Sequence, residues 1–215
     1  MLLNIVGEKG KVFCFEPDKI NFQHLKKNTA SLKNIELFNN AVSDKKDVIK
    51  VYKSKLLNLD HRTYPVDDYE SIEEINAVSI DELIAEQRLS KVDIIKIDIQ
   101  GYELFAFKAM MNVLKTNPYL KIITEYWPHG FKKAGNLAIE LHKFFTDLGF
   151  KFSISEDNKV LPLSEKYIID NNDQPYEFFF NVFIKKIWRK VTHDEFVELE
   201  LEYCGYKTCE VTPGQ

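Results

Sequence analysis

The chain has 215 residues, of which 45% are hydrophobic, so it can bury the core of one domain. Its net charge of −4 gives no general attraction to nucleic acid, and no apolar run is long enough to span a membrane. Its three cysteines lack metal-ligand spacing. We therefore predict a soluble, cytoplasmic protein with one domain at 1–187, a C-terminal extension at 188–215, and no nucleic-acid or membrane partner.

The first predicted strand, Val12–Phe15, is a short apolar run that ends in Glu16 and Pro17. Asp18 is expected to cap a helix that continues to about Ser31. An acidic residue at the end of such a strand commonly accepts hydrogen bonds from both ribose hydroxyls of a nucleotide, because a carboxylate has two acceptor oxygens. Glu16 is therefore a candidate for nucleotide binding.

The middle of the chain continues the alternation of strands and helices. Strands are expected at 35–38 and 48–52, and residues 53–74, which are polar and irregular, predict a functional loop or lid. A short strand should end at 77–78. Ser79 and Glu82 then form a capping-box pattern before a helix at 80–87.

The most informative segment is KVDIIKIDIQGYELFAF, at 91–107. Its isoleucines predict a strand buried on both faces, as in a parallel sheet, followed by Asp98, Gln100 and Gly101 and then by a helix from about Tyr102. Open α/β sheets bind ligands just beyond the carboxyl ends of their strands. Asp98 therefore marks a candidate site, although a carboxylate that caps the next helix would give the same pattern.

The remaining elements complete an α/β sheet. A strand is expected at 121–126 and ends at Pro128, and an amphipathic helix at 137–148 is capped by Gly149. Strands at 150–155 and 178–184 close the sheet. Thr192 and Glu195 predict one more capped helix in the extension.

Six short segments follow one another in a recognisable order: GKVFCFEPDKINFQHLKKN, NNAVSD, DHRTY, VSIDEL, KIDIQGYEL and TEYWPHG. In this order and spacing the chain resembles the FkbM-type methyltransferases over roughly 7–186. The resemblance implies a Rossmann-like α/β fold with a mostly parallel sheet and an antiparallel last strand. It also implies S-adenosyl-L-methionine as cofactor and O-methylation of a sugar, glycan or natural-product hydroxyl.

The chain departs from this family at its start. The family's Asp-x-Gly-x-x-x-Gly signature is expected before Met1, because Gly7 and Gly10 are typical of a helix stop and a turn. We therefore expect an N-terminally truncated sheet that lacks its central strand, between the strand at 12–15 and the strand that begins at Asp93. The segment 206–212 is the one later candidate to fill that place.

The resemblance also implies roles for residues at the strand ends. Glu16 would bind the cofactor ribose, a backbone amide at the junction of Asn40 and Ala41 would lie near the adenine, and Asp98 would border both cofactor and acceptor. Asn40 could equally be a plain turn residue. Gln100 cannot act as a base, because its amide only orients other groups.

His61 is the candidate general base, since an imidazole titrates near physiological pH and a neighbouring carboxylate can orient it. Arg62 could bind an anionic or carbonyl group of the acceptor through its guanidinium group. The alternative is a solvated loop with a surface histidine. Trp127 and His129, at the end of the strand at 121–126, could line the acceptor pocket, whereas Tyr126 is expected in the core.

Two other functions remain open. The chain could be a non-catalytic methyltransferase-like domain that has lost the cofactor loop and binds a partner or ligand. It could also be a sugar-nucleotide enzyme on a similar sheet. Such an enzyme normally needs a metal-binding acidic pair, to which the acidic residues at 67–68 and 93–98 correspond poorly, and we predict no metal site.

Overall fold

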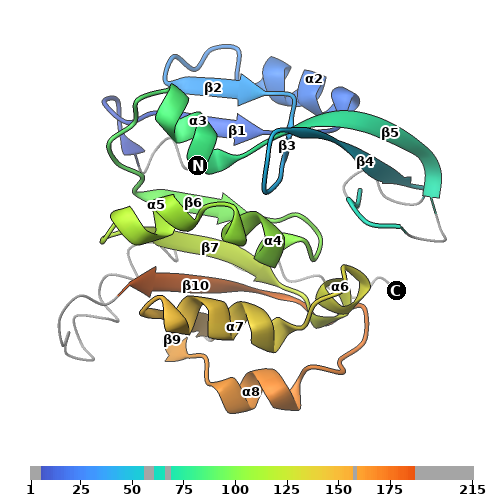
Figure 1. The fold of residues 1–215 in the computed structure, drawn as a ribbon, viewed down its shortest axis with the longest axis vertical. Coiled ribbons are helices and arrows are strands. Elements are labelled where there is room, and N and C mark those ends of the chain that lie inside the picture. Colours follow the sequence, from blue (N-terminus) through green and yellow to red (C-terminus); the bar gives the residue numbers. More distant parts are fainter. Residues whose placement is uncertain (1–5, 56–60, 66–68, 157–158, 187–215) are drawn as a thin grey trace. The chain divides into compact units, whose positions relative to one another are not determined.

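The computed structural model describes residues 6–55, 61–65, 69–156 and 159–186, which form two compact units (Figure 1). The N-terminal unit comprises 1–91 and 99–113, and the C-terminal unit comprises 92–98 and 114–215. The predicted extension, its capped helix and the segment 206–212 lie outside the described residues.

The N-terminal unit begins with a parallel strand–helix–strand arrangement. β1 (Val12–Phe15) pairs in parallel with β2 (Ile35–Phe38), and α2 (Lys19–Asn28) connects them. Parallel strands need such a crossover, and α2 starts at Asp18 as predicted. The helix ends at Asn28, three residues before the predicted end at Ser31. The hydroxyl of its C-cap, Thr29, donates to the Leu25 carbonyl.

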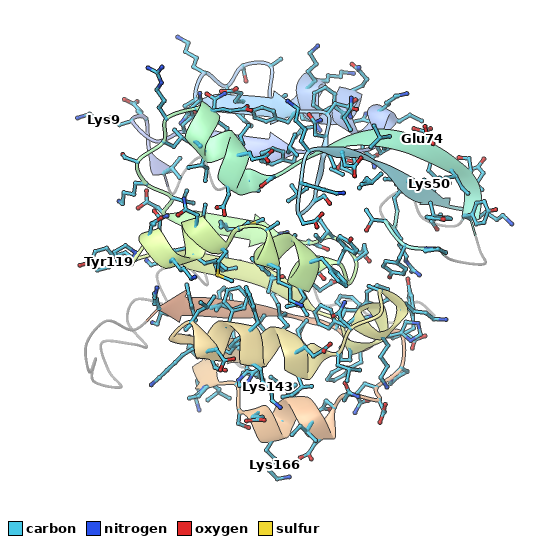
Figure 2. The ribbon with its side chains drawn as sticks, viewed as in Figure 1. Lys9, Lys50, Glu74, Tyr119, Lys143 and Lys166 are labelled. Carbon is cyan, nitrogen blue, oxygen red and sulfur yellow. The ribbon has the colours of Figure 1, made fainter. Side chains whose placement is uncertain are left out.

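A second sheet of this unit has the order β3 (Ala41–Val42), β5 (Tyr69–Val78) and β4 (Asp47–Ser54). β3 runs parallel to β5, and β4 pairs with β5 as a long antiparallel ribbon (Figure 1). The predicted loop at 53–74 is therefore wrong in extent, because both of its ends belong to strands. Glu74, from this segment, lies opposite Lys50 of β4 in the pairing register (Figure 2).

The helices of this unit use a different cap from the predicted one. α3 (Ile80–Glu86) starts after Ser79, but the Ser79 side chain makes no capping hydrogen bond, so the capping-box prediction is wrong. Asp81, in the first turn of α3, caps a different helix. Its carboxylate accepts hydrogen bonds from the backbone N–H groups at 112 and 113, in the first turn of α5 (Met111–Thr116). α4 (Glu103–Lys108) precedes α5 and begins at the predicted Tyr102.

The C-terminal unit contains a five-stranded sheet whose last strand is antiparallel, as predicted. Its order is β6 (Ile94–Ile97), β7 (Lys121–Tyr126), β10 (Phe180–Lys186), β8 (Phe150–Glu156) and β9 (Lys159–Pro162). β6 and β7 are parallel, whereas β10 is antiparallel to both β7 and β8. The apolar run at 180–184 thus forms an interior strand rather than an edge.

Three helices accompany this sheet. α7 (Ala138–Asp147) lies along the sheet and packs against α8 (Glu165–Asp170), and α6 (Pro128–Lys133) follows β7 (Figure 1). The helix predicted at 137–148 is confirmed, and Gly149 follows it with φ 81°, a conformation that glycine adopts without a steric penalty. None of the described helices is long and apolar enough to cross a membrane.

The two strands expected to flank a missing neighbour each pair on one side within the described residues. β1 pairs with β2, and β6 pairs with β7. The second edge of each strand has no strand partner in that part of the chain. The missing central strand itself stays a prediction.

Candidate functional site

Glu16 lies at the carboxyl end of β1, where the fold fixes both its backbone and its side chain. Its N–H donates to the Phe38 carbonyl at the end of β2 (3.0 Å), and its carboxylate oxygen Oε1 accepts from the Asp18 N–H (2.9 Å). Burial raises the pKa of this half-buried carboxyl, while the Asp18 N–H opposes that shift. The carboxylate therefore has a defined orientation where parallel strands end.

The asparagines after β2 join this strand end to the second sheet. The Asn39 amide donates to the carbonyls of Glu16 (2.9 Å) and Pro17 (3.0 Å), and the Asn40 amide donates to the Asn76 carbonyl in β5 (3.2 Å). Ala41 is buried in β3. The structure thus brings Glu16, Asn40 and Ala41 to one edge of the unit. Asn39, which we did not predict, was visible only as a polar residue at a strand end.

A buried ionic cluster follows Glu16. Asp18 caps α2 through Oδ1, which accepts from two backbone N–H groups, and its Oδ2 lies 2.7 Å from the Lys53 ammonium. Lys53 also lies 2.8 Å from a Glu73 carboxylate oxygen. The Asp18 side chain is 1% exposed, and that of Lys53 is 12% exposed. We did not predict this cluster, because residues 53–74 were expected to form a functional loop or lid rather than paired strands.

His61 contacts the same cluster and is not a solvated surface residue. Its side chain is 9% exposed, its Nδ1 accepts from the Ser54 N–H (3.2 Å), and its Nε2 lies 3.7 Å from Asp18 Oδ2. A nitrogen that accepts a hydrogen bond is unprotonated, so the neutral imidazole carries its proton on Nε2. The lone pair that a base needs is thus occupied by Ser54 in this arrangement. The role of His61 as a base stays a prediction.

Asp18 should make the stability of the chain depend on acid pH. Burial opposes its ionisation, but the Lys53 ammonium and the Asn21 N–H outweigh burial and hold the pKa of Asp18 below its ordinary value. The lowered pKa stabilises the fold above the unfolded pKa of about 3.9, and this stabilisation disappears as pH falls through the lower folded pKa. Asp18→Asn should therefore be less stable than wild type at pH 7, and its stability should fall less than that of wild type as the pH drops below about 4.

Urea unfolding of wild type and Asp18→Asn across this pH range measures the effect. Asp173→Asn, whose side chain is 85% exposed, is the matched control and should follow the wild-type profile. Parallel pH profiles of Asp18→Asn and wild type would contradict the coupling.

Arg62 and Tyr64 connect the described residues 61–65, here called the His61 segment, to their surroundings. Arg62 and Tyr52 exchange two backbone hydrogen bonds (2.8 and 3.1 Å), and the Arg62 guanidinium lies 6.0 Å from the centre of the Tyr64 ring. The buried Tyr64 hydroxyl donates to the Gln100 carbonyl (2.8 Å). Gln100 has φ 56° and Gly101 has φ 96°, so Tyr64 braces a turn whose first residue is in an unfavourable conformation.

Tyr64→Phe should lower the free energy of unfolding by about 1 kcal/mol, because the ring remains but the bond to the Gln100 carbonyl is lost. Urea denaturation measures this change. Tyr119→Phe is the control, since Tyr119 is 77% exposed (Figure 2), and it should change stability little. Equal stabilities of Tyr64→Phe and wild type would show that the hydroxyl does not brace the turn.

Asp98 belongs to the C-terminal unit and follows β6. Its side chain is 40% exposed, and its Oδ2 lies 3.8 Å from the Lys96 ammonium. Tyr102 is at the N-cap of α4, and the Ile99 N–H donates to Glu103. The role of Asp98 stays a prediction.

Trp127 and His129 also belong to the C-terminal unit and lie at the end of β7. Trp127 is 3% exposed, its indole N–H donates to the Tyr176 carbonyl (2.8 Å), and its ring lies 5.7 Å from the His129 ring. The Tyr176 ring contacts both at 5.2 and 5.5 Å and is itself 42% exposed. His129 and Tyr176 are thus the accessible rings of this cluster, and Trp127 supports them.

Tyr126 packs in the core, as expected. It is 1% exposed and stacks on Phe180, and burial raises the pKa of its hydroxyl.

The predicted site residues form two groups. Glu16, Asn40, Ala41, His61 and Arg62 belong to the N-terminal unit, and Asp98, Trp127 and His129 belong to the C-terminal unit. Among the described residues, no cluster of three or more His, Cys, Asp or Glu side chains could hold a metal.

The sequence profile of the methyltransferase FkbM domain matches residues 1–152. The crystal structure of methyltransferase FkbM from Methylobacillus flagellatus KT is similar, with 14% identity and a TM-score of 0.48. The alignment covers 81% of this chain and 36% of that one, so the chain spans about a third of that protein's length. No curated protein matches the chain.

Proposed function

Because the chain belongs to the methyltransferase FkbM domain family, we propose that it is an S-adenosyl-L-methionine-dependent methyltransferase. Its acceptor would be a hydroxyl group of a sugar, glycan or natural product. The observation that carries the proposal is the oriented Glu16 carboxylate at the carboxyl end of β1, beside the β2 end. Such a carboxylate has the acceptors that a ribose diol requires.

The residues at this edge fit the nucleoside part of the cofactor. Glu16 would accept hydrogen bonds from the two ribose hydroxyls, and the backbone at Asn40 and Ala41 would contact the adenine. Asn39 would keep the two strand ends together, since it bonds to the carbonyls of Glu16 and Pro17. When bound, the cofactor supplies a methyl group already activated on a sulfonium, so the protein's main task is to hold and align the acceptor.

A hydroxyl acceptor must also lose its proton. His61 and Asp98 are the proposed groups for this step, and each would need a lone pair within hydrogen-bond reach of that hydroxyl. For His61, Nδ1 would first have to release the Ser54 N–H. Arg62 would bind a polar group of the acceptor. In the C-terminal unit, His129, supported by Trp127, is a separate candidate for contact with an apolar face of a ligand.

Isothermal calorimetry with S-adenosylhomocysteine, followed by transfer of a radiolabelled methyl group to a panel of sugars and glycans, tests the proposal. We expect binding by wild type and methyl transfer to at least one hydroxyl acceptor. A folded chain that binds neither S-adenosylhomocysteine nor S-adenosyl-L-methionine would contradict it. That result would favour a non-catalytic binding domain.

A further inference from the structure

Lys53, near the end of β4, is an unusually buried cation. Its side chain is 12% exposed, and its ammonium bridges the carboxylates of Asp18 (2.7 Å) and Glu73 (2.8 Å). Lysine is rarely buried unless it is paired, because removing an ammonium from water costs several kcal/mol. Lys50, on the same strand, is instead exposed (Figure 2). Lys53 therefore differs from an exposed strand lysine, because its ammonium is held between two carboxylates.

Asp18 connects this cation to Glu16. Its backbone N–H donates to Glu16 Oε1, and its Oδ1 accepts the N–H groups of Ile20 and Asn21 at the start of α2. Its other oxygen, Oδ2, faces Lys53. A change in the position or ionisation of the Asp18 side chain would thus disturb both the helix cap and the bond that orients Glu16.

Asp18 and Ser54, the residue after Lys53, border His61. Its Nε2 faces Asp18 Oδ2 at 3.7 Å, and its Nδ1 accepts from the Ser54 N–H. The imidazole is therefore held between the cap of α2 and the end of β4. Lys53 pairs with Asp18 and precedes Ser54 in the chain, so it lies next to both contacts.

We propose that Lys53 is a positioning residue: its ammonium joins Asp18 to Glu73 and so keeps the His61 segment against the helix cap that orients Glu16. This proposal rests on the proposed function, because Glu16 and His61 are its candidate cofactor and acceptor residues. Without Lys53, two carboxylates would face each other and the imidazole with no ammonium between them. Asp18 would then be protonated or turn toward water.

Hydrogen exchange of two amides measures the positioning without any ligand. The Ser54 N–H bonds to His61 Nδ1, and the Arg62 N–H bonds to the Tyr52 carbonyl. Lys53→Met should speed the exchange of both amides at least tenfold, while the matched control Lys50→Met should stay within twofold of wild type. In Lys53→Met, the carboxyl ¹³C signal of Asp18 should also titrate at higher pH, because the ammonium lowers the Asp18 pKa.

A double-mutant cycle then connects Lys53 to the cofactor site. Lys53→Met should weaken S-adenosylhomocysteine binding about tenfold, and its effect should be non-additive with that of Glu16→Gln if Lys53 acts by orienting Glu16. A general loss of stability would leave the two effects additive. Additive effects would therefore overturn the connection to Glu16.

The exchange experiment is independent of the proposed function. If wild type does not bind S-adenosylhomocysteine, the proposed function fails, whereas unchanged exchange of the Ser54 and Arg62 amides in Lys53→Met would overturn the positioning role. If Lys53→Met does not fold, Asp18→Asn replaces it, since its amide oxygen can still cap α2 while the charge that pairs with Lys53 is lost. Unchanged exchange in Asp18→Asn would equally overturn the proposal.

Discussion

Glu16→Ala is expected to weaken the binding of S-adenosylhomocysteine by a factor of about 150 or more. Each hydrogen bond to a charged group contributes about 1.5–3 kcal/mol, and the alanine variant would lose two such bonds to the ribose. The methyl side of the cofactor would be unaffected, so the loss should appear equally with S-adenosyl-L-methionine. Calorimetry at constant pH and salt measures both dissociation constants.

Two further variants make this prediction specific. Glu16→Gln keeps one acceptor oxygen and should bind more weakly than wild type but more tightly than Glu16→Ala. Glu36→Ala removes a glutamate from the neighbouring β2 whose ion pair is with Lys11, and it should bind like wild type. Wild-type affinity in Glu16→Ala would show that this carboxylate does not hold the ribose.

The parallel core of the fold could be predicted because its sequence signals are local. Short apolar strands, the Asp18 cap and the Gly149 stop each have a direct physical cause within a few residues, and the structure contains them. β5 was mostly missed, because its outward positions carry glutamates and only Ile75 and Ala77 are buried. Burial on one face of a charged strand depends on tertiary packing, which a short sequence window does not contain.

The candidate site was predicted less completely than the fold. Glu16 and Asn40 follow predicted strands, so topology alone brings them to one edge of the N-terminal unit. Lys53 and Glu73, however, become neighbours only through the antiparallel pairing of β4 with β5. The contacts of His61 with Ser54 and Asp18 are likewise absent from the local sequence of its triplet, which is typical of a solvated loop.

His61→Ala tests the remaining catalytic prediction once an acceptor is known. If His61 is the general base, turnover should fall 10²–10⁴-fold and the acid limb of the pH–rate profile should disappear, because no imidazole would remain to take the acceptor proton. Substrate affinity should change much less than turnover. Steady-state kinetics from about pH 5 to 9 measures both quantities.

His24→Ala is the matched control, because His24 is exposed on α2, and it should leave turnover unchanged. The hydrogen bond from Ser54 to Nδ1 gives a second, structural way to decide. A base must release that bond, so binding of the acceptor should speed hydrogen exchange of the Ser54 amide. If His61→Ala keeps both wild-type turnover and the acid limb, His61 only positions its segment. The proton would then pass to another group, for which Asp98 is the next candidate, and Asp98→Asn should carry the loss instead.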